Sequence, residues 1–218
     1  MGGAVLLQND HLIVNRVRID PDGVGYPLQE IDRQGKELTL FGPQESYRVG
    51  GTFGLARLLA ARRNGQLVAV KPYEYVVELY ASNLALAESF ARSANWFKSL
   101  PAGKSPSGGR GDEPPSTIVK GAWEDTTGML WTATVVPAPG WKPGPNLAAW
   151  RRGAPLKPAG EGINTMIEVI DLATGRLVTS ARVNPYIVHS LSNGYVASYK
   201  EDSDGTPLID VWRLFLVR

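Results

Sequence analysis

Arg57, Lys120, Glu124 and His189 are the residues of this chain whose types suit acid–base or metal chemistry at a shared centre. Each lies in a run that predicts the first strand of a repeated unit, so a fold that gathers those strands around a channel would make the four side chains channel-facing candidates. Glu124 is the main acidic candidate, with Asp125 nearer the following turn. A catalytic metal needs several convergent carboxylates, and a lone histidine on a strand is usually structural. We therefore expect no catalytic residue among them.

The sequence also argues against other common chemistries. It contains no cysteine and only two histidines, so disulfides, thiol nucleophiles and zinc–thiolate sites are excluded. It contains neither a Gly-x-Ser-x-Gly elbow nor a glycine-rich phosphate loop. Residues 20–23 (Asp-Pro-Asp-Gly) and 202–205 (Asp-Ser-Asp-Gly) resemble the start of calcium loops, but they lack the downstream glutamate and are typical of turns. We expect no cofactor, with calcium as the alternative.

Tryptophans and basic residues gather in two long segments, 93–116 and 137–163. The candidate residues for binding a ligand or partner there are Trp96, Trp141, Lys142, Trp150, Arg151 and Arg152. Exposed tryptophan near a cationic side chain suits stacking on sugars, on aromatic ligands or on the hot spot of a protein partner. The alternative is that these tryptophans fold back and pin Pro/Gly-rich loops to the scaffold. The Arg-Gly-Asp tripeptide at 110–112 is a short match that we attribute to chance.

The elements that must position these residues come from a pattern that occurs four times. Each copy has a polar turn, a strand-like run, a gap and a second strand-like run. Such a repeat predicts four-stranded antiparallel units, and a series of these units predicts an all-β protein with a β-propeller fold. The turns are Asn9-Asp10, Asn64-Gly65, Thr127-Gly128 and Asn193-Gly194, and the second runs cover 27–32, 75–80, 166–171 and 208–213.

We name the strands of each unit a to d, from the channel outward. The four units divide a single propeller domain, 1–218, into blades at approximately 3–42, 54–92, 116–184 and 185–218. In the first blade, we expect strand b over 11–19 and strand c over 26–32. The segment 84–91 could begin a helix after Ser82-Asn83, but the repeat favours a strand. The fourth blade ends after strand c, so about four blades of an incomplete six-bladed ring are expected.

The predicted topology places both long segments on one face of the protein. In an up-and-down blade, the b–c and d–a connections leave from the same end of the sheet. Segment 93–116 is a d–a connection and segment 137–163 is a b–c connection. Long loops on one face of a rigid scaffold are common sites of binding.

Composition limits the classes of partner. Hydrophobic residues make up 43% of the chain and charged residues 20%, which is ordinary for a globular protein. The formal net charge of +2 gives no argument for nucleic acid or for an anionic membrane. No run approaches the ~18–20 apolar residues that a membrane-spanning helix needs. We expect no nucleic-acid partner and no transmembrane segment.

Several short motifs resemble a bacterial family of six-bladed β-propellers, whose members are mostly uncharacterised exported or lipid-anchored proteins and are more loosely similar to NHL-repeat propellers. The resemblance implies that this chain corresponds to the four C-terminal blades, and that the protein is exported if a signal lies upstream. The motifs that carry it are Phe41-Gly42, Arg57-Leu58, Asn95-Trp96-Phe97, Trp123-Glu124-Asp125, Gly128-Met129-Leu130-Trp131, Ile167-Glu168-Val169-Ile170-Asp171, Ala197-Ser198-Tyr199-Lys200-Glu201-Asp202 and Val211-Trp212-Arg213-Leu214.

These patterns favour a non-catalytic scaffold that binds a ligand or a protein partner, neither of which the sequence identifies, through the face with the two long segments. The alternative is a metal-assisted hydrolase, similar to lactonase propellers, whose active site is completed by blades outside this chain. An open arc of blades leaves two blade faces without neighbours, which predicts self-association through the open blade edges.

Overall fold

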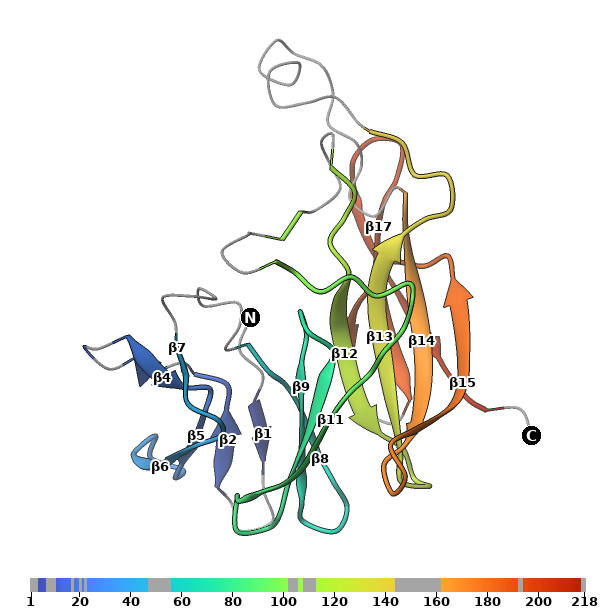
Figure 1. The fold of residues 1–218 in the computed structure, drawn as a ribbon. Coiled ribbons are helices and arrows are strands. Elements are labelled where there is room, and N and C mark those ends of the chain that lie inside the picture. The colour runs from blue at the N-terminus through green and yellow to red at the C-terminus, as the bar shows by residue number, and fades with distance from the viewer. Residues whose placement is uncertain are drawn as a thin grey trace. The chain divides into compact units, whose positions relative to one another are not determined.

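Every regular element in the described part of the chain is a β-strand (Figure 1). The computed structural model describes residues 4–6, 11–16, 18–19, 21, 23–46, 56–101, 106–107, 113–143, 162–191 and 194–216. Within these ranges there is no helix long and apolar enough to cross a membrane. The chain divides into two compact units: Met1–Asn95 with Ser99–Ser105, and Trp96–Lys98 with Pro106–Arg218.

The first unit contains two four-stranded antiparallel sheets. The strands of one are β1 (Ala4–Leu6), β2 (Leu12–Val14), β5 (Leu28–Ile31) and β6 (Glu37–Phe41). The strands of the other are β8 (Leu58–Ala61), β9 (Leu67–Lys71), β10 (Val76–Tyr80) and β11 (Leu86–Ala91). In both sheets, each strand pairs with the one before it, so each has the a-b-c-d order of a propeller blade. We call these sheets blade 1 and blade 2.

A small third sheet in the first unit corrects the strands predicted for blade 1. The expected strand over 11–19 is divided into β2 and β3 (Arg18–Ile19), and the expected strand over 26–32 is divided into β4 (Val24–Tyr26) and β5. β3, β4 and β7 (Glu45–Ser46) form a separate sheet, which we call the flap. The division occurs at Pro27, which has no backbone N–H for the ladder, and the Asn15 side chain donates a 2.7 Å hydrogen bond to the Pro27 carbonyl.

The ambiguous segment 84–91 forms a strand, as the repeat predicts. Ser82 and Asn83 make the turn before it instead of capping a helix. The Leu84 N–H donates to the Ala81 carbonyl at 2.9 Å, and the Asn83 side-chain oxygen accepts from the Ala85 N–H at 3.1 Å. Leu84 takes a positive φ of 63° at this turn, a left-handed conformation that ends any helical path.

The second unit contains a four-stranded sheet, blade 3, and a three-stranded sheet, blade 4. Blade 3 consists of β12 (Ile118–Glu124), β13 (Met129–Pro137), β14 (Ile163–Asp171) and β15 (Arg176–Val183). Blade 4 consists of β16 (Ile187–Ser190), β17 (Tyr195–Glu201) and β18 (Pro207–Arg213). Both are antiparallel and follow chain order. All six tryptophans of the chain belong to this unit.

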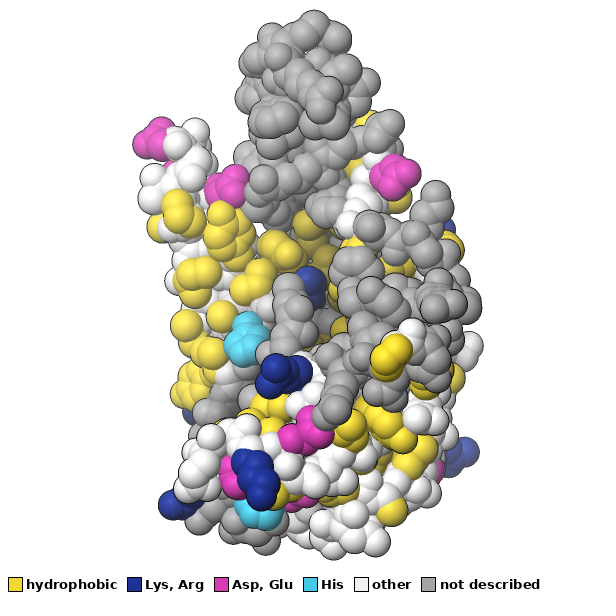
Figure 2. Space-filling model, turned by 90° about the vertical axis from the view of Figure 1, so that its left-hand side faces the viewer, with side chains coloured by type: hydrophobic (Ala, Val, Ile, Leu, Met, Phe, Trp, Pro, Cys, Tyr) yellow, Lys and Arg dark blue, Asp and Glu magenta, His cyan; other side chains and the backbone are white. Residues whose placement is uncertain are grey.

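Part of the apolar surface remains exposed. Figure 2 shows hydrophobic side chains gathered on one face of the molecule. The outer strand β18 contributes several exposed apolar side chains, in contrast to β14, the equivalent strand of blade 3, which is almost entirely buried. The exposed apolar residues of β17 and β18 are Tyr195, Leu208, Ile209, Val211 and Trp212.

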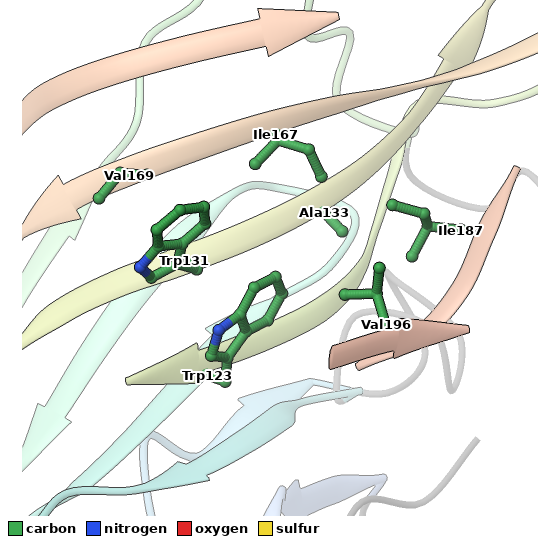
Figure 3. Close-up of a cluster of buried hydrophobic side chains, with 7 residues drawn as sticks. All are labelled: Trp123, Trp131, Ala133, Ile167, Val169, Ile187 and Val196. Carbon is green, nitrogen blue, oxygen red and sulfur yellow. The ribbon is translucent and has the colours of Figure 1, made fainter. Parts of the chain in front are cut away.

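Neighbouring blades within each unit pack through equivalent faces. In the first unit, Ile13 and Leu28 of blade 1 pack with Leu67 and Tyr80 of blade 2. In the second unit, one face of blade 3 packs against Ile187 and Val196 of blade 4 (Figure 3). The indole rings of Trp123 and Trp131 stack on this face with centroids 5.9 Å apart. The residues that blade 3 contributes are Trp123, Trp131, Ala133, Ile167 and Val169.

The innermost strands of neighbouring blades lie against each other. β1 contacts β8 in the first unit, and β12 contacts β16 in the second. At Gly121 of β12, an added Cβ would lie 3.1 Å from the Cβ of Ser190, so a larger residue at 121 would require Ser190 to shift by a few tenths of an ångström. Sheets that follow a-b-c-d order and meet through their a strands are propeller blades. The chain therefore has the predicted fold class, an all-β β-propeller of antiparallel blades.

Candidate functional site

A buried cluster of charged residues in the first unit is the most elaborate polar site among the described residues. Arg57 lies directly before β8, and its side chain is fully buried. Its guanidinium binds Glu78 through two hydrogen bonds, from Nε to Oε2 at 2.9 Å and from Nη2 to Oε1 at 3.0 Å. Nη1 donates to the Ala56 carbonyl at 3.0 Å. This fork geometry makes the pair strong and directional.

Glu45 of the flap connects this pair to the surface. Its Oε1 accepts from Arg57 Nη2 at 2.8 Å and lies 2.6 Å from Nζ of Lys71, at the end of β9. Lys71 also lies 3.4 Å from a carboxylate oxygen of Glu74. The Glu45 side chain is 22% exposed and that of Lys71 is 15% exposed, whereas the side chain of Glu78 is 2% exposed. The cluster therefore extends from the interior of blade 2 to the base of the flap.

Burial and neighbouring charges shift the pKa values of Arg57 and Tyr80 in this cluster. Burial alone would lower the pKa of Arg57, but the carboxylates of Glu78 and Glu45 outweigh it and raise the pKa above its ordinary value. Tyr80 donates a 2.9 Å hydrogen bond to Glu78. Burial, followed by the negative charge of Glu78, raises the pKa of Tyr80 far above that of a free tyrosine. Both groups therefore stay protonated at neutral pH, and neither can act there as a base.

The site of Glu78 recurs in every blade, a feature that the sequence reasoning missed. The equivalent residues of strand c each pair with the fourth residue after the turn that precedes strand b: Gln29 with Val14, Glu78 with Ala69, Glu168 with Thr132 and Asp210 with Ser198. The first three are buried, whereas Asp210 is partly exposed and lies 2.8 Å from Nζ of Lys200. The signal was present in the second runs of the repeat, which each carry a polar residue at this position.

The other three channel-facing candidates lie in the second unit. Lys120 is the extra residue of a bulge in β12, between the pairs made by Val119 and Gly121, and burial lowers its pKa. Glu124 ends β12, and His189 is exposed on β16, where it pairs with Ala197. Glu124 lies four residues after Lys120 along the strand, a span of roughly 13 Å. Within the described ranges, no three His, Asp or Glu residues form a group that could hold a metal ion.

The binding candidates lie in or next to the long segments. Trp96 and Phe97 form an edge-to-face pair with ring centroids 6.0 Å apart. Trp141 is half-buried with its indole nitrogen out of solvent, and the neighbouring Lys142 is exposed. Trp150, Arg151 and Arg152 lie outside the described residues.

A paired stem supports the segment that contains Trp141. β13 and β14 are each nine residues long and stay in register as far as Pro137 opposite Ile163. The Ala138 N–H extends the ladder with a 2.8 Å hydrogen bond to the Gly162 carbonyl, and Trp141 N–H donates to the Ala138 carbonyl at 3.0 Å. Arg182 of β15 braces the stem by donating to the Pro137 carbonyl at 2.9 Å. The loop base is thus held by the sheet.

The calcium-like motif at 202–205 is a turn, as its composition indicates. Oδ1 of Asp202 accepts hydrogen bonds from the Asp204 N–H at 2.9 Å and the Thr206 N–H at 2.8 Å. Gly205 takes a φ of +79° at the end of this turn. Within the motif at 20–23, both aspartates lie outside the described residues.

Comparisons with known proteins give no relationship closer than fold-level likeness. No protein-family model and no curated protein matches the chain. One similar solved structure comes from the GH130 family of mannoside phosphorylases, which contains glycoside hydrolases that target β-1,2 mannosidic linkages in Candida mannan. It is 10% identical to this chain with a TM-score of 0.44, and the match covers 96% of this chain and 64% of that one. The chain therefore spans less than two thirds of the length of that protein.

Two lyases are also similar. A streptogramin B lyase is 13% identical with a TM-score of 0.31, and the match covers 99% of this chain and 83% of the lyase. A virginiamycin B lyase from Staphylococcus aureus is 11% identical with a TM-score of 0.34, covering 98% and 74%. All three TM-scores are below 0.5, and the sheets and contacts described above are what define the fold of this chain.

Proposed function

We propose that this protein is a non-catalytic propeller scaffold that binds a ligand or protein partner through the end of the blades that carries the b–c and d–a connections. The observation that carries the proposal is the β13–β14 stem, which stays paired up to the base of the loop that contains Trp141 and Lys142. A rigid stem lowers the conformational entropy that a binding loop loses when it engages a partner. Membership of the bacterial six-bladed family, and export, belong to the same proposal.

The state of the charged residues supports a scaffold over an enzyme. The ionic side chains of Arg57, Glu78 and Glu45 bind one another. A catalytic acid or base must instead be free to exchange a proton near neutral pH and must reach the substrate. The cluster joins the flap to blade 2, so these ion pairs hold the flap in position.

Variants at the loop base test the proposal. Affinity capture with the purified chain, followed by fluorescence titration of any retained molecule, should give a complex that Trp141→Ala weakens about 30-fold, the equivalent of about 2 kcal/mol at a binding hot spot. Lys142→Glu changes an exposed residue and should weaken binding without affecting the fold. Trp212→Ala removes an exposed tryptophan of β18, away from the loop base, and should leave binding unchanged.

Two results would count against the proposal. Equal binding by the wild type, Trp141→Ala and Lys142→Glu would remove the loop base from the binding site. An increase in the melting temperature on adding Ca²⁺, together with hydrolysis of a lactone, would instead favour the metal-assisted hydrolase.

A further inference from the structure

The exposed face of blade 4 is equivalent, position by position, to a face of blade 3 that is buried. Gly128 and Gly194 directly precede strand b in the two blades, which aligns Trp131 with Ala197 and Ala133 with Tyr199. Val169 pairs with Trp131, and Val211 pairs with Ala197. By the same register, Ile167 of blade 3 corresponds to Ile209 of blade 4.

Burial differs sharply between these equivalent residues. Ile167 is 5% exposed and Val169 is 1% exposed, because blade 4 covers them. Ile209 and Val211 are each 59% exposed. They lie on the face of blade 4 opposite to Val196, whose side chain packs against blade 3. This face of blade 4 therefore has the apolar pattern of a blade–blade contact, and its apolar side chains are exposed.

The chain itself contains a blade face that fits this surface. Ile13 and Leu28 of blade 1 point toward blade 2, so Leu12 and Ile31, which pair with each other, lie on the opposite, outward face. Leu12 corresponds to Val196, the residue with which blade 4 packs against blade 3. Both Leu12 and Ile31 are half-buried, and together they offer apolar surface at the positions that such a contact uses.

The charges at the rims of the two faces are opposite. Arg213 pairs with Tyr195 on the exposed face of blade 4, and its guanidinium lies over the Tyr195 ring, 5.8 Å from the centroid. Glu37 pairs with Ile31 on the outward face of blade 1 and is exposed. Arg213 ends strand c and Glu37 begins strand d, so both lie at the end of the sheet that carries the c–d turns. Stacked blades would bring these charges together.

We propose that the exposed face of blade 4 binds the outward face of blade 1 of a second copy of the chain. The contact is head-to-tail and uses the same blade–blade packing that buries Trp123, Trp131 and Val196 within one molecule. Such a heterologous contact closes into a ring when its rotation allows and otherwise extends into a filament. The surface is separate from the loop base that carries the proposed binding function.

Light scattering coupled to size-exclusion chromatography tests the proposal over a range of protein concentrations. The purified 218-residue chain should have at least twice its monomer mass at tens of micromolar. Val211→Glu should raise the dissociation constant at least tenfold, because it places a charge in the apolar contact. Val178→Glu is a matched control: Val178 is 52% exposed on β15, outside the proposed contact, and the variant should associate like the wild type.

A charge exchange distinguishes blade 1 from other occupants of the surface. Arg213→Glu and Glu37→Arg should each weaken association, and the double variant should restore it. A monomer at every concentration would overturn the proposal. Association that Val178→Glu weakens as much as Val211→Glu would also overturn it, as would a double variant that stays as weak as the single ones.

Discussion

Replacing Arg57 by methionine should destabilise the first unit strongly. The substitution puts an apolar side chain in place of the guanidinium and removes hydrogen bonds that include two to Glu78, one to Glu45 and one to the Ala56 carbonyl. Glu78 would keep the Tyr80 hydroxyl as a partner but would be a buried carboxylate without a counter-charge. Removing one member of a buried ion pair costs about 3–5 kcal/mol.

Hydrogen exchange measured by mass spectrometry can localise this loss. All six tryptophans belong to the second unit, so tryptophan fluorescence would not report on the first. The most protected amides of β9 and β10 should exchange about 10²- to 10³-fold faster in Arg57→Met, since each ~1.4 kcal/mol is a factor of ten. Lys200→Met removes an exposed pair, whose side chains are 58% and 40% exposed, and should cost ~0–1 kcal/mol.

The double variant Arg57→Met/Glu78→Gln separates loss of charge balance from loss of packing. Without the buried carboxylate, it should recover roughly half or more of the stability that Arg57→Met loses. If Arg57→Met changed exchange in β9 and β10 no more than Lys200→Met changes it in β17, the buried cluster would not be a source of stability. If the double variant were as unstable as the single one, the cost would be one of packing.

Three further substitutions have expected outcomes of known sign. Burial lowers the pKa of Lys120, because it disfavours the charged form, so Lys120→Met should raise the free energy of unfolding by up to about 1 kcal/mol at pH 7. In thermal melts at rising pH, this gain in stability should shrink above the pKa of folded Lys120. A variant less stable than the wild type would contradict this expectation. Burial would raise the pKa of Asp125, but hydrogen bonds from Trp131 and Thr127 outweigh it and lower the pKa. Asp125→Asn should therefore cost about 1–2 kcal/mol in urea unfolding at pH 7. That difference should begin to shrink below about pH 4, where the carboxylate of the unfolded chain protonates, and should keep shrinking as the pH falls through the lower pKa of the folded state; a pH-independent difference would refute it. Gly42→Ala should cost about 1–3 kcal/mol in thermal unfolding, because φ is +93° and an added Cβ would lie 2.8 Å from Pro27 Cγ; a neutral result would show that the turn relaxes.

The sequence predicts the strands well where alternation and turn residues agree. The second runs expected over 166–171 and 208–213 fall within β14 and β18, and the segment 84–91 contains the strand β11 where a helix was the alternative. The error in blade 1 arose at Pro27, where the apolar pattern continues but the backbone ladder cannot. A proline within a predicted strand was therefore a readable signal for the flap.

The buried cluster could not be predicted in the same way. Arg57 and Glu78 are 21 residues apart, directly before β8 and on β10 with β9 between them, and Glu45 comes from a sheet that the sequence pattern did not reveal. These three side chains come together only because the flap packs on blade 2, and the strand propensity of each segment does not determine that packing. The repeated polar residue of strand c was visible, but only the ladder registers show that Glu78 and Glu168 occupy one structural position.

The close approach of Gly121 to Ser190 has a consequence for how this fold tolerates change. The spacing between two neighbouring inner strands is limited at this point by the backbone and one small side chain. A larger residue at 121 would push β12 and β16 apart, and a small displacement of these inner strands would become a larger one at the outer strands. Gly121 therefore limits how closely the two inner strands approach each other, on the same strand that contributes Trp123 to the core between the blades.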